Sequence, residues 1–118
     1  MAAGAGGSII NISSLAAIRP QAHIVTYAAA KAGLNAMTEA MADALGPKVR
    51  VNCIMPGPFL TDISKAWDME AFQRRADDRI ALKRGGAPEE IVGAALYLAS
   101  DHASFTTAAI IRIDGGCR

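Results

Sequence analysis

The order of apolar runs along the chain constrains its fold most strongly. Residues 8–12 form a short apolar run between a glycine and a serine, which predicts a strand buried on both faces. Residues 26–45 contain no proline, and apolar side chains recur every three or four positions until Gly46-Pro47, which predicts a long helix. Residues 49–54 alternate apolar and polar side chains and predict a second strand ahead of the turn Pro56-Gly57-Pro58.

The remainder of the chain continues this alternation. Residues 62–83 are polar, with aromatic and apolar side chains at irregular helical intervals, and predict one or two loosely anchored helices. Residues 88–98 begin with a proline and two acids and predict a further helix, and residues 109–113 predict a third strand. This order is typical of an α/β fold with a parallel sheet covered by helices. A sheet of three strands leaves an unpaired edge, so we expect the sheet to be incomplete.

Composition and charge narrow the possible partners. The chain has 118 residues, and 12 basic against 11 acidic side chains give a net charge of +1. These values indicate one globular domain without the broad positive field that nucleic acids or anionic membranes require, so we expect neither partner. No apolar run reaches the roughly 20 residues of a membrane span and no signal peptide is evident, so we expect a cytoplasmic protein. Cys53 and Cys117 lack metal-ligand spacing, so we expect two free thiols and no metal site.

Tyr27 and Lys31 form the first candidate catalytic pair. They are four residues apart in the expected long helix, so they lie on one helical face. A neighbouring ammonium favours the phenolate form of a tyrosine, and such a group can exchange protons with an alcohol or carbonyl oxygen. The same spacing also occurs in ordinary amphipathic helices, so the pair alone does not identify an enzyme.

Ser13 and Ser14 supply hydroxyl groups beside this pair. Both follow the first expected strand, at the carboxyl edge of a parallel sheet, where α/β folds bind their ligands. A serine hydrolase is a weaker alternative, because the sequence has no Gly-x-Ser-x-Gly elbow and neither histidine has a matching partner.

Four motifs together resemble the carboxyl-terminal half of the short-chain dehydrogenases/reductases. The resemblance extends from about residue 7 to residue 116 and implies a partial Rossmann-like, doubly wound parallel sheet. The motifs are Gly7-Ser8-Ile9-Ile10-Asn11-Ile12-Ser13-Ser14, Tyr27-Ala28-Ala29-Ala30-Lys31-Ala32-Gly33, Val51-Asn52-Cys53-Ile54-Met55-Pro56-Gly57 and Ile113-Asp114-Gly115-Gly116.

The resemblance implies an oxidoreductase that transfers hydride between NAD or NADP and an alcohol or carbonyl substrate. Tyr27 resembles the family's general acid/base, and Lys31 resembles the lysine that assists it and holds the nicotinamide ribose. Ser14 matches the serine that hydrogen-bonds the substrate oxygen, and Ser13 is the less favoured alternative. Three further residues resemble those that receive the nicotinamide end of the cofactor: Pro56, Gly57 and Thr61.

The family's amino-terminal features are missing from this sequence. Gly4, Gly6 and Gly7 precede a strand and so cannot form the glycine-rich turn that binds pyrophosphate. We therefore expect residues 1–118 to be a partial domain that lacks the dinucleotide-binding half and is inactive alone. Ala108 stands where the family often has glycine, and Ala81 where it often has proline.

Two questions stay open at this level. A non-catalytic truncated homologue or a helix-mediated assembly module is the alternative function, because five small residues share one face of the expected long helix: Ala29, Ala32, Gly33, Ala36 and Ala40. In the family this helix joins subunits, which implies a homodimer or homotetramer of the complete protein. Residues 62–80 fall where the family has its substrate lid. Their aromatic side chains either line an apolar pocket or form the hydrophobic face of a surface helix.

Overall fold

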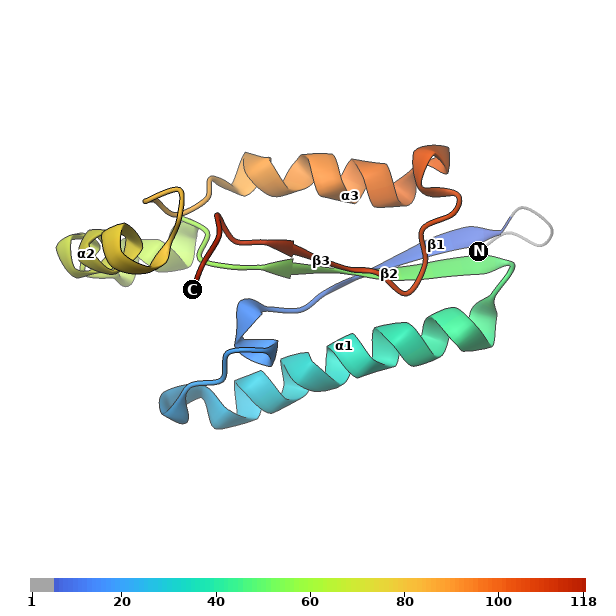
Figure 1. The fold of residues 1–118 in the computed structure, drawn as a ribbon, viewed down its shortest axis with the longest axis horizontal. Helices are drawn as coiled ribbons and strands as arrows, with labels where there is room; N and C mark the ends of the chain where they lie inside the picture. Colours follow the sequence, from blue (N-terminus) through green and yellow to red (C-terminus); the bar gives the residue numbers. More distant parts are fainter. Residues whose placement is uncertain (1–5) are drawn as a thin grey trace.

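The structure is a computed structural model that describes residues 6–118. Gly4, expected in the loop before the first strand, lies outside the described residues. The described part of the chain forms one small parallel sheet with helices on both of its faces (Figure 1).

The sheet contains three parallel strands in the order β1-β2-β3, as predicted. They are β1 (Gly7–Ile12), β2 (Val49–Pro56) and β3 (Ile110–Ile113). The register sets Ile12 of β1 opposite Ile54, which in turn lies opposite Ile111 of β3. All three strands therefore point their carboxyl ends toward one edge of the sheet.

Three α-helices connect the strands, and short 3-10 turns flank them. The predicted long helix is α1, and the polar region expected to hold one or two helices contains a 3-10 turn followed by α2. The helices are α1 (Val25–Leu45), α2 (Met69–Arg79) and α3 (Val92–Ala99), and the turns are η1 (Leu15–Ala17), η2 (Ala22–Ile24), η3 (Asp62–Ala66), η4 (Pro88–Ile91) and η5 (Asp101–Ala103).

Helices α1 and α3 cover opposite faces of the sheet (Figure 1). Successive side chains of β2 point to alternate faces, as in any strand. The Cys53 thiol accordingly donates to Asn35 of α1, at 3.6 Å, while Ile54 packs against Leu98 of α3. Both residues are fully buried, so β2, the central strand of the sheet, has a hydrophobic layer on each of its faces.

The first strand is less buried than its apolar sequence predicts. We expected residues 8–12 to be covered on both faces, but they are only half-buried and Ile12 is 47% exposed. The reason is position: β1 lies at the edge of the sheet and pairs only with β2 among the described residues.

Two polar side chains of β2 fasten the carboxyl-terminal third of the chain to the sheet. Asn52 is fully buried, donates to the carbonyl of Thr106 (2.9 Å) and accepts from the amide of Ala109 (3.0 Å). The Arg50 guanidinium donates to the carbonyl of Leu98 at the end of α3 (3.0 Å), where helix carbonyls lack partners. These bonds align β3 with β2.

None of the helices in residues 6–118 is both long enough and apolar enough to cross a membrane.

Candidate active site

The two serines after β1 have different environments. Ser13 is 2% exposed, and its hydroxyl has no hydrogen-bond partner among the described residues. Ser14 is only half-buried and caps η1, where its hydroxyl oxygen accepts from the amide of Ala16 at 3.1 Å. Because that bond occupies a lone pair, the hydroxyl proton of Ser14 is left to donate elsewhere.

Tyr27 and Lys31 occupy successive turns at the start of α1. The Lys31 ammonium lies 5.7 Å from the centroid of the Tyr27 ring and donates to the carbonyl of Ile12, at 3.0 Å. The side chain of Tyr27 is 47% exposed. Lysine has three N–H donors, so the ammonium can serve further acceptors beside the phenol.

The Lys31 bond joins this helix to the serines. Ile12 is the last residue of β1 and stands two positions before Ser14, so the lysine links the helix to the segment with the candidate hydroxyl. The amide of Ser13 donates to the carbonyl of Ile54 in β2, at 2.9 Å. This second bond holds the ends of β1 and β2 together at the edge where the candidate side chains lie.

Pro56, Gly57 and Thr61 share a groove beside the end of β2. The groove has a volume of about 400 Å³, and its lining also includes Trp67 and Ile91. A Cβ atom on Gly57 would lie 2.5 Å from the Cβ of Asp114, so the turn after β2 approaches the end of β3 too closely for any other residue. The structure thus brings together the three residues that resemble the nicotinamide-binding set.

The aromatic residues of the expected lid divide between the two roles considered above. The rings of Trp67 and Phe72 stack with centroids 5.4 Å apart. Trp67 lines the groove, whereas Phe72 is buried in a small core with Ala76 and Ile80. Met69 is largely exposed.

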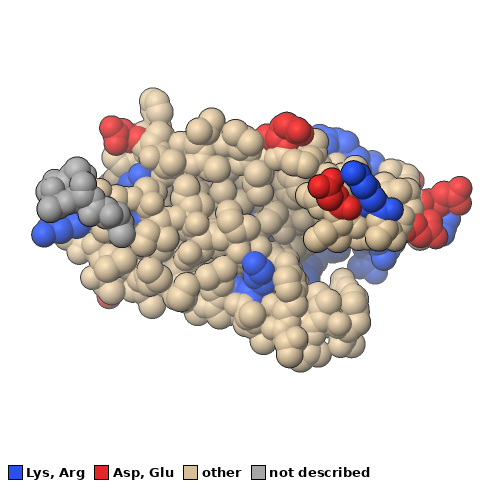
Figure 2. Space-filling view, turned by 180° about the vertical axis from the view of Figure 1, so that it is seen from behind, with Lys and Arg blue, Asp and Glu red and all other residues tan. Residues whose placement is uncertain are grey.

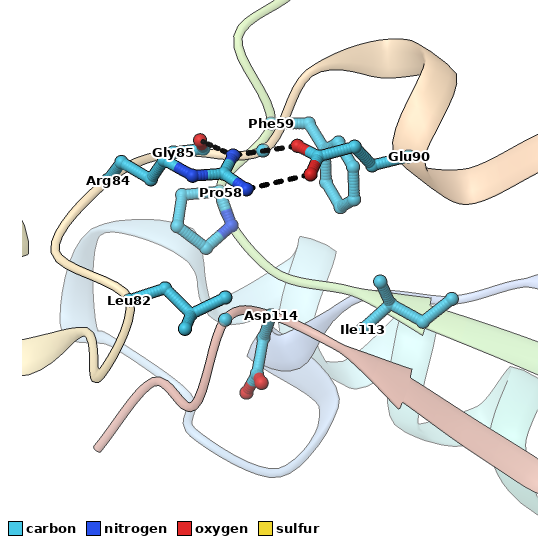
Figure 3. Close-up of a pocket in the computed structure, with 10 residues that line it drawn as sticks. Pro58, Phe59, Leu82, Arg84, Gly85, Glu90, Ile113 and Asp114 are labelled. Carbon is cyan, nitrogen blue, oxygen red and sulfur yellow. Dashed lines mark hydrogen bonds and ion pairs between the residues drawn. The ribbon is translucent and has the colours of Figure 1, made fainter.

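The loop after α2 is fastened by an ion pair (Figure 3). Both oxygens of the Glu90 carboxylate accept from the Arg84 guanidinium at 2.7 Å, and the amide of Ala87 adds a third bond at 2.7 Å. The bond from Arg84, with that from Ala87, lowers the pKa of Glu90 to about 2. The sequence does not predict this pair, because the fold of the loop brings Arg84 and Glu90 together.

Asp114 carries the second carboxylate of this region. Figure 3 shows it pointing away from the Arg84–Glu90 pair, across a small pocket of about 170 Å³. Burial alone would raise the pKa of Asp114, but hydrogen bonds from Arg112 and the Gly116 amide outweigh that effect, so its pKa is lowered. The charged form therefore stabilises the turn after β3.

This geometry provides proton-transferring groups and a place for a flat ring. Ser14 and Tyr27 offer hydroxyl protons, Lys31 offers a fixed positive charge, and the groove at Gly57 offers an apolar wall. Residues 6–118 contain no strand followed by a glycine-rich turn and a helix, the arrangement that binds a pyrophosphate. The described residues therefore fit the reactive end of a dinucleotide but not its phosphates.

Comparisons with known proteins identify a family model and several relatives that match nearly the whole chain. The family model described as enoyl-(acyl carrier protein) reductase matches residues 1–118. L-xylulose reductase of Caenorhabditis elegans is 41% identical over 112 residues, which are 93% of this chain and 45% of that protein. A 3-oxoacyl-[acyl-carrier-protein] reductase of Chlamydia trachomatis is 42% identical over 111 residues, which are 93% of this chain and 44% of that protein.

Solved structures give the same picture. A 7α-hydroxysteroid dehydrogenase complexed with NADH and 7-oxo glycochenodeoxycholic acid has a TM-score of 0.89 at 35% identity, covering 96% of this chain and 45% of that one. A 3-oxoacyl-(acyl-carrier-protein) reductase of Agrobacterium tumefaciens with NADP bound has a TM-score of 0.87 at 35% identity, covering 94% and 45%. The chain thus spans less than half the length of these relatives.

Proposed function

The chain belongs to the short-chain dehydrogenase/reductase family, and we propose that it supplies the catalytic half of an NAD(P)-dependent oxidoreductase acting on an alcohol or carbonyl compound. The observation that carries this proposal is the Lys31 ammonium, which lies beside the Tyr27 ring and is bonded to the last carbonyl of β1. That bond places a charge, a phenol and the serine segment at one sheet edge. Residues 1–118 are then a partial domain without the glycine-rich dinucleotide-binding half.

Tyr27 transfers the proton in the proposed mechanism. Tyr27 is 47% exposed, so a substrate can approach this residue from the surface rather than through the core. It gives a proton to the carbonyl oxygen in reduction and takes one from the alcohol in oxidation, as a general acid/base. The bound nicotinamide supplies or receives the hydride.

In this mechanism Lys31 positions the cofactor, and Ser14 polarises the substrate oxygen. The Lys31 ammonium lies beside the Tyr27 ring, and its free N–H groups would hold the ribose hydroxyls of the cofactor. Ser14 accepts from Ala16, so it can donate its proton to the substrate oxygen. Ser13 is too deeply buried for that role, which supports the choice of Ser14.

The cofactor we propose is NAD or NADP. Pro56, Gly57 and Thr61 form the wall against which the nicotinamide end would rest, and the groove they share supports this assignment. The NADH and NADP bound in the two solved relatives support it as well. The free thiols of Cys53 and Cys117 are consistent with the cytoplasmic location that we propose.

A homodimer or homotetramer is the assembly we propose for the complete protein. The small residues on the outer side of α1 are exposed apart from the half-buried Ala32, and a Cβ added at Gly33 would meet no atom within 4 Å. A helix from a second copy could approach this face closely. An assembly module without catalysis is the alternative that this face alone would support.

The function can be tested in the completed protein, meaning these 118 residues joined behind the amino-terminal half that the longer relatives possess. We expect it to reduce carbonyl compounds with NADH or NADPH, and we expect Lys31→Gln to raise the KM for the dinucleotide about tenfold, the worth of one charged hydrogen bond. Lys48→Gln, an exposed lysine beyond α1, is the control. A folded completed protein that reduces no carbonyl with either dinucleotide would refute the proposal.

A further inference from the structure

A second, larger cavity lies between the segment after β1 and helix α2. Its volume is about 690 Å³. Figure 2 shows the molecule hollowed at its α2 end, with basic side chains at the rim of the hollow. Its charged lining residues are Arg75, Asp78, Arg79 and Arg118, and its lining also includes Leu15, His23 and Phe72.

One wall of this cavity belongs to the segment that carries the proposed catalytic hydroxyls. Leu15 directly follows Ser14 and begins the turn that Ser14 caps. His23 stands four residues before Tyr27, in the 3-10 turn that leads into α1. Ser14 and Tyr27 do not line the cavity themselves, but their neighbours Leu15 and His23 do, so we infer that a substrate bound at Ser14 and Tyr27 extends toward it.

The opposite wall is apolar at its base and basic at its rim. Phe72, Ala76 and Ile80 form the buried core beneath α2, and all three also line the cavity. Above them, Arg79 lies 3.4 Å from the carboxylate of Asp78, which balances its charge. Neither Arg75 nor Arg118 has an ion pair or a side-chain hydrogen bond within residues 6–118, so both charges are available to a ligand, and Arg75 is the one that α2 holds above the apolar base.

We propose that this cavity binds the far end of the substrate, and that this end carries an anionic group, a carboxylate or a phosphate, held by Arg75. A guanidinium presents a planar fork of donors that matches both kinds of anion, and the apolar base accommodates a carbon chain between the anion and the reacting carbon. The inference rests on the proposed function, because it assigns a substrate class to the same site.

The test compares matched substrates in the completed protein. Levulinate and its longer-chain oxo-acid homologues are paired with their methyl esters, and dihydroxyacetone phosphate is paired with dihydroxyacetone. We expect at least one anionic member to have a KM about tenfold or more below that of its neutral partner, as expected for a hydrogen-bonded charge pair. We expect Arg75→Gln to remove this preference and to leave the KM of the neutral members unchanged.

Arg74→Gln is the matched control. Arg74 is the preceding residue of α2, is exposed and does not line the cavity, so its loss changes the net charge equally without touching the proposed site. The KM for the dinucleotide is measured in both variants, because a cofactor phosphate is the other anion that an arginine near the site could bind. A rise of the dinucleotide KM alone in Arg75→Gln would overturn the proposal, as would equal use of anionic and neutral substrates.

A binding measurement separates this inference from the proposed function. Binding of levulinate, its homologues and their esters to the Tyr27→Phe variant is measured by titration calorimetry. This measurement does not require turnover. Binding of the acids that is lost in Arg75→Gln supports the anion site even where no carbonyl is reduced. Equal binding of acids and esters refutes the anion site even where the completed protein proves to be a reductase.

Discussion

At the scale of single residues, Ala108 adopts a backbone conformation that suits glycine. Ala108 lies just before β3, and its φ is 60°, in the left-handed region. Its amide donates to the carbonyl of Val51. A side chain in this region costs about 1 kcal/mol. The family resemblance already marked this position as one where glycine is common, and the structure supplies the physical reason.

We therefore expect Ala108→Gly to raise the free energy of unfolding by about 0.5 to 1 kcal/mol, because glycine adopts positive φ without strain. Chemical denaturation of the completed protein measures the change. Ala109→Gly is the control: Ala109 lacks a positive φ, so glycine there relieves no strain and should destabilise by giving the unfolded chain more freedom. Equal effects of the two substitutions would contradict the strain argument.

Some properties of single residues could be predicted from the sequence, and others could not. The helical spacing of Tyr27 and Lys31 and the strand before Ser14 could be read directly, because both depend on local periodicity. The burial of Ser13 could not, since it depends on the pairing of β1 with β2, two segments about forty residues apart. The same holds for the Arg84–Glu90 pair and for Arg75, because their neighbours depend on how α2 and the following loop pack.

At the scale of elements, the loop between α2 and α3 depends on the charge of Glu90. This carboxylate accepts three hydrogen bonds, and the bonds from Arg84 and Ala87 lower its pKa to about 2. A group with a lowered pKa stabilises the fold above its unfolded value of about 4.3. That stabilisation is lost as the pH falls from there toward 2.

We therefore expect Glu90→Gln to flatten the loss of stability between pH 5 and pH 2. Thermal unfolding at a series of pH values measures it. Glu89→Gln is the matched control, because Glu89 is the exposed neighbour and the structure describes no hydrogen bond or ion pair of its side chain. If the two variants lose stability with the same pH dependence, the Arg84–Glu90 ion pair does not stabilise the loop.

The outer side of α1 gives a second prediction at this scale. The faces of this helix follow its 3.6-residue period, which is why the buried Thr38 and the exposed Ala36 could be assigned to opposite sides from the sequence. We expect Ala36→Glu to shift the completed protein toward monomers, because it places a charge in the proposed helix contact.

Sedimentation velocity measures this change, and Ala30→Glu is its control. Ala30 is also exposed on α1 but lies about a third of a turn around the helix from Ala36. A completed protein that is monomeric without any substitution would contradict the proposed interface.

At the scale of the whole molecule, the chain presents an unfinished sheet. β1 lies at the edge, pairs only with β2 among the described residues, and leaves Ile12 exposed. The relatives extend to more than twice the length of this chain, and an added strand would cover that edge. The alternation of strands and helices predicted the parallel sheet, whereas which strands lie at its edge follows from pairing over long distances in the sequence.

This incompleteness also explains why we expect no turnover from the 118 residues alone. The proposed catalytic residues lie at one edge of the sheet, but none of the elements in residues 6–118 has the strand, glycine-rich turn and helix that bind the pyrophosphate of a dinucleotide. Activity should appear only when the preceding half is joined or added. Carbonyl reduction is therefore to be measured in the completed protein.

The most direct test is the rate of carbonyl reduction by Tyr27→Phe in the completed protein. Tyr97→Phe is its matched control, because Tyr97 is the other tyrosine of this chain and its hydroxyl bonds to Thr106, away from the proposed site. We predict that Tyr27→Phe lowers kcat by about a hundred- to ten-thousandfold, the usual worth of a general acid/base, and that Tyr97→Phe leaves it unchanged. An unaltered kcat in Tyr27→Phe would contradict the account.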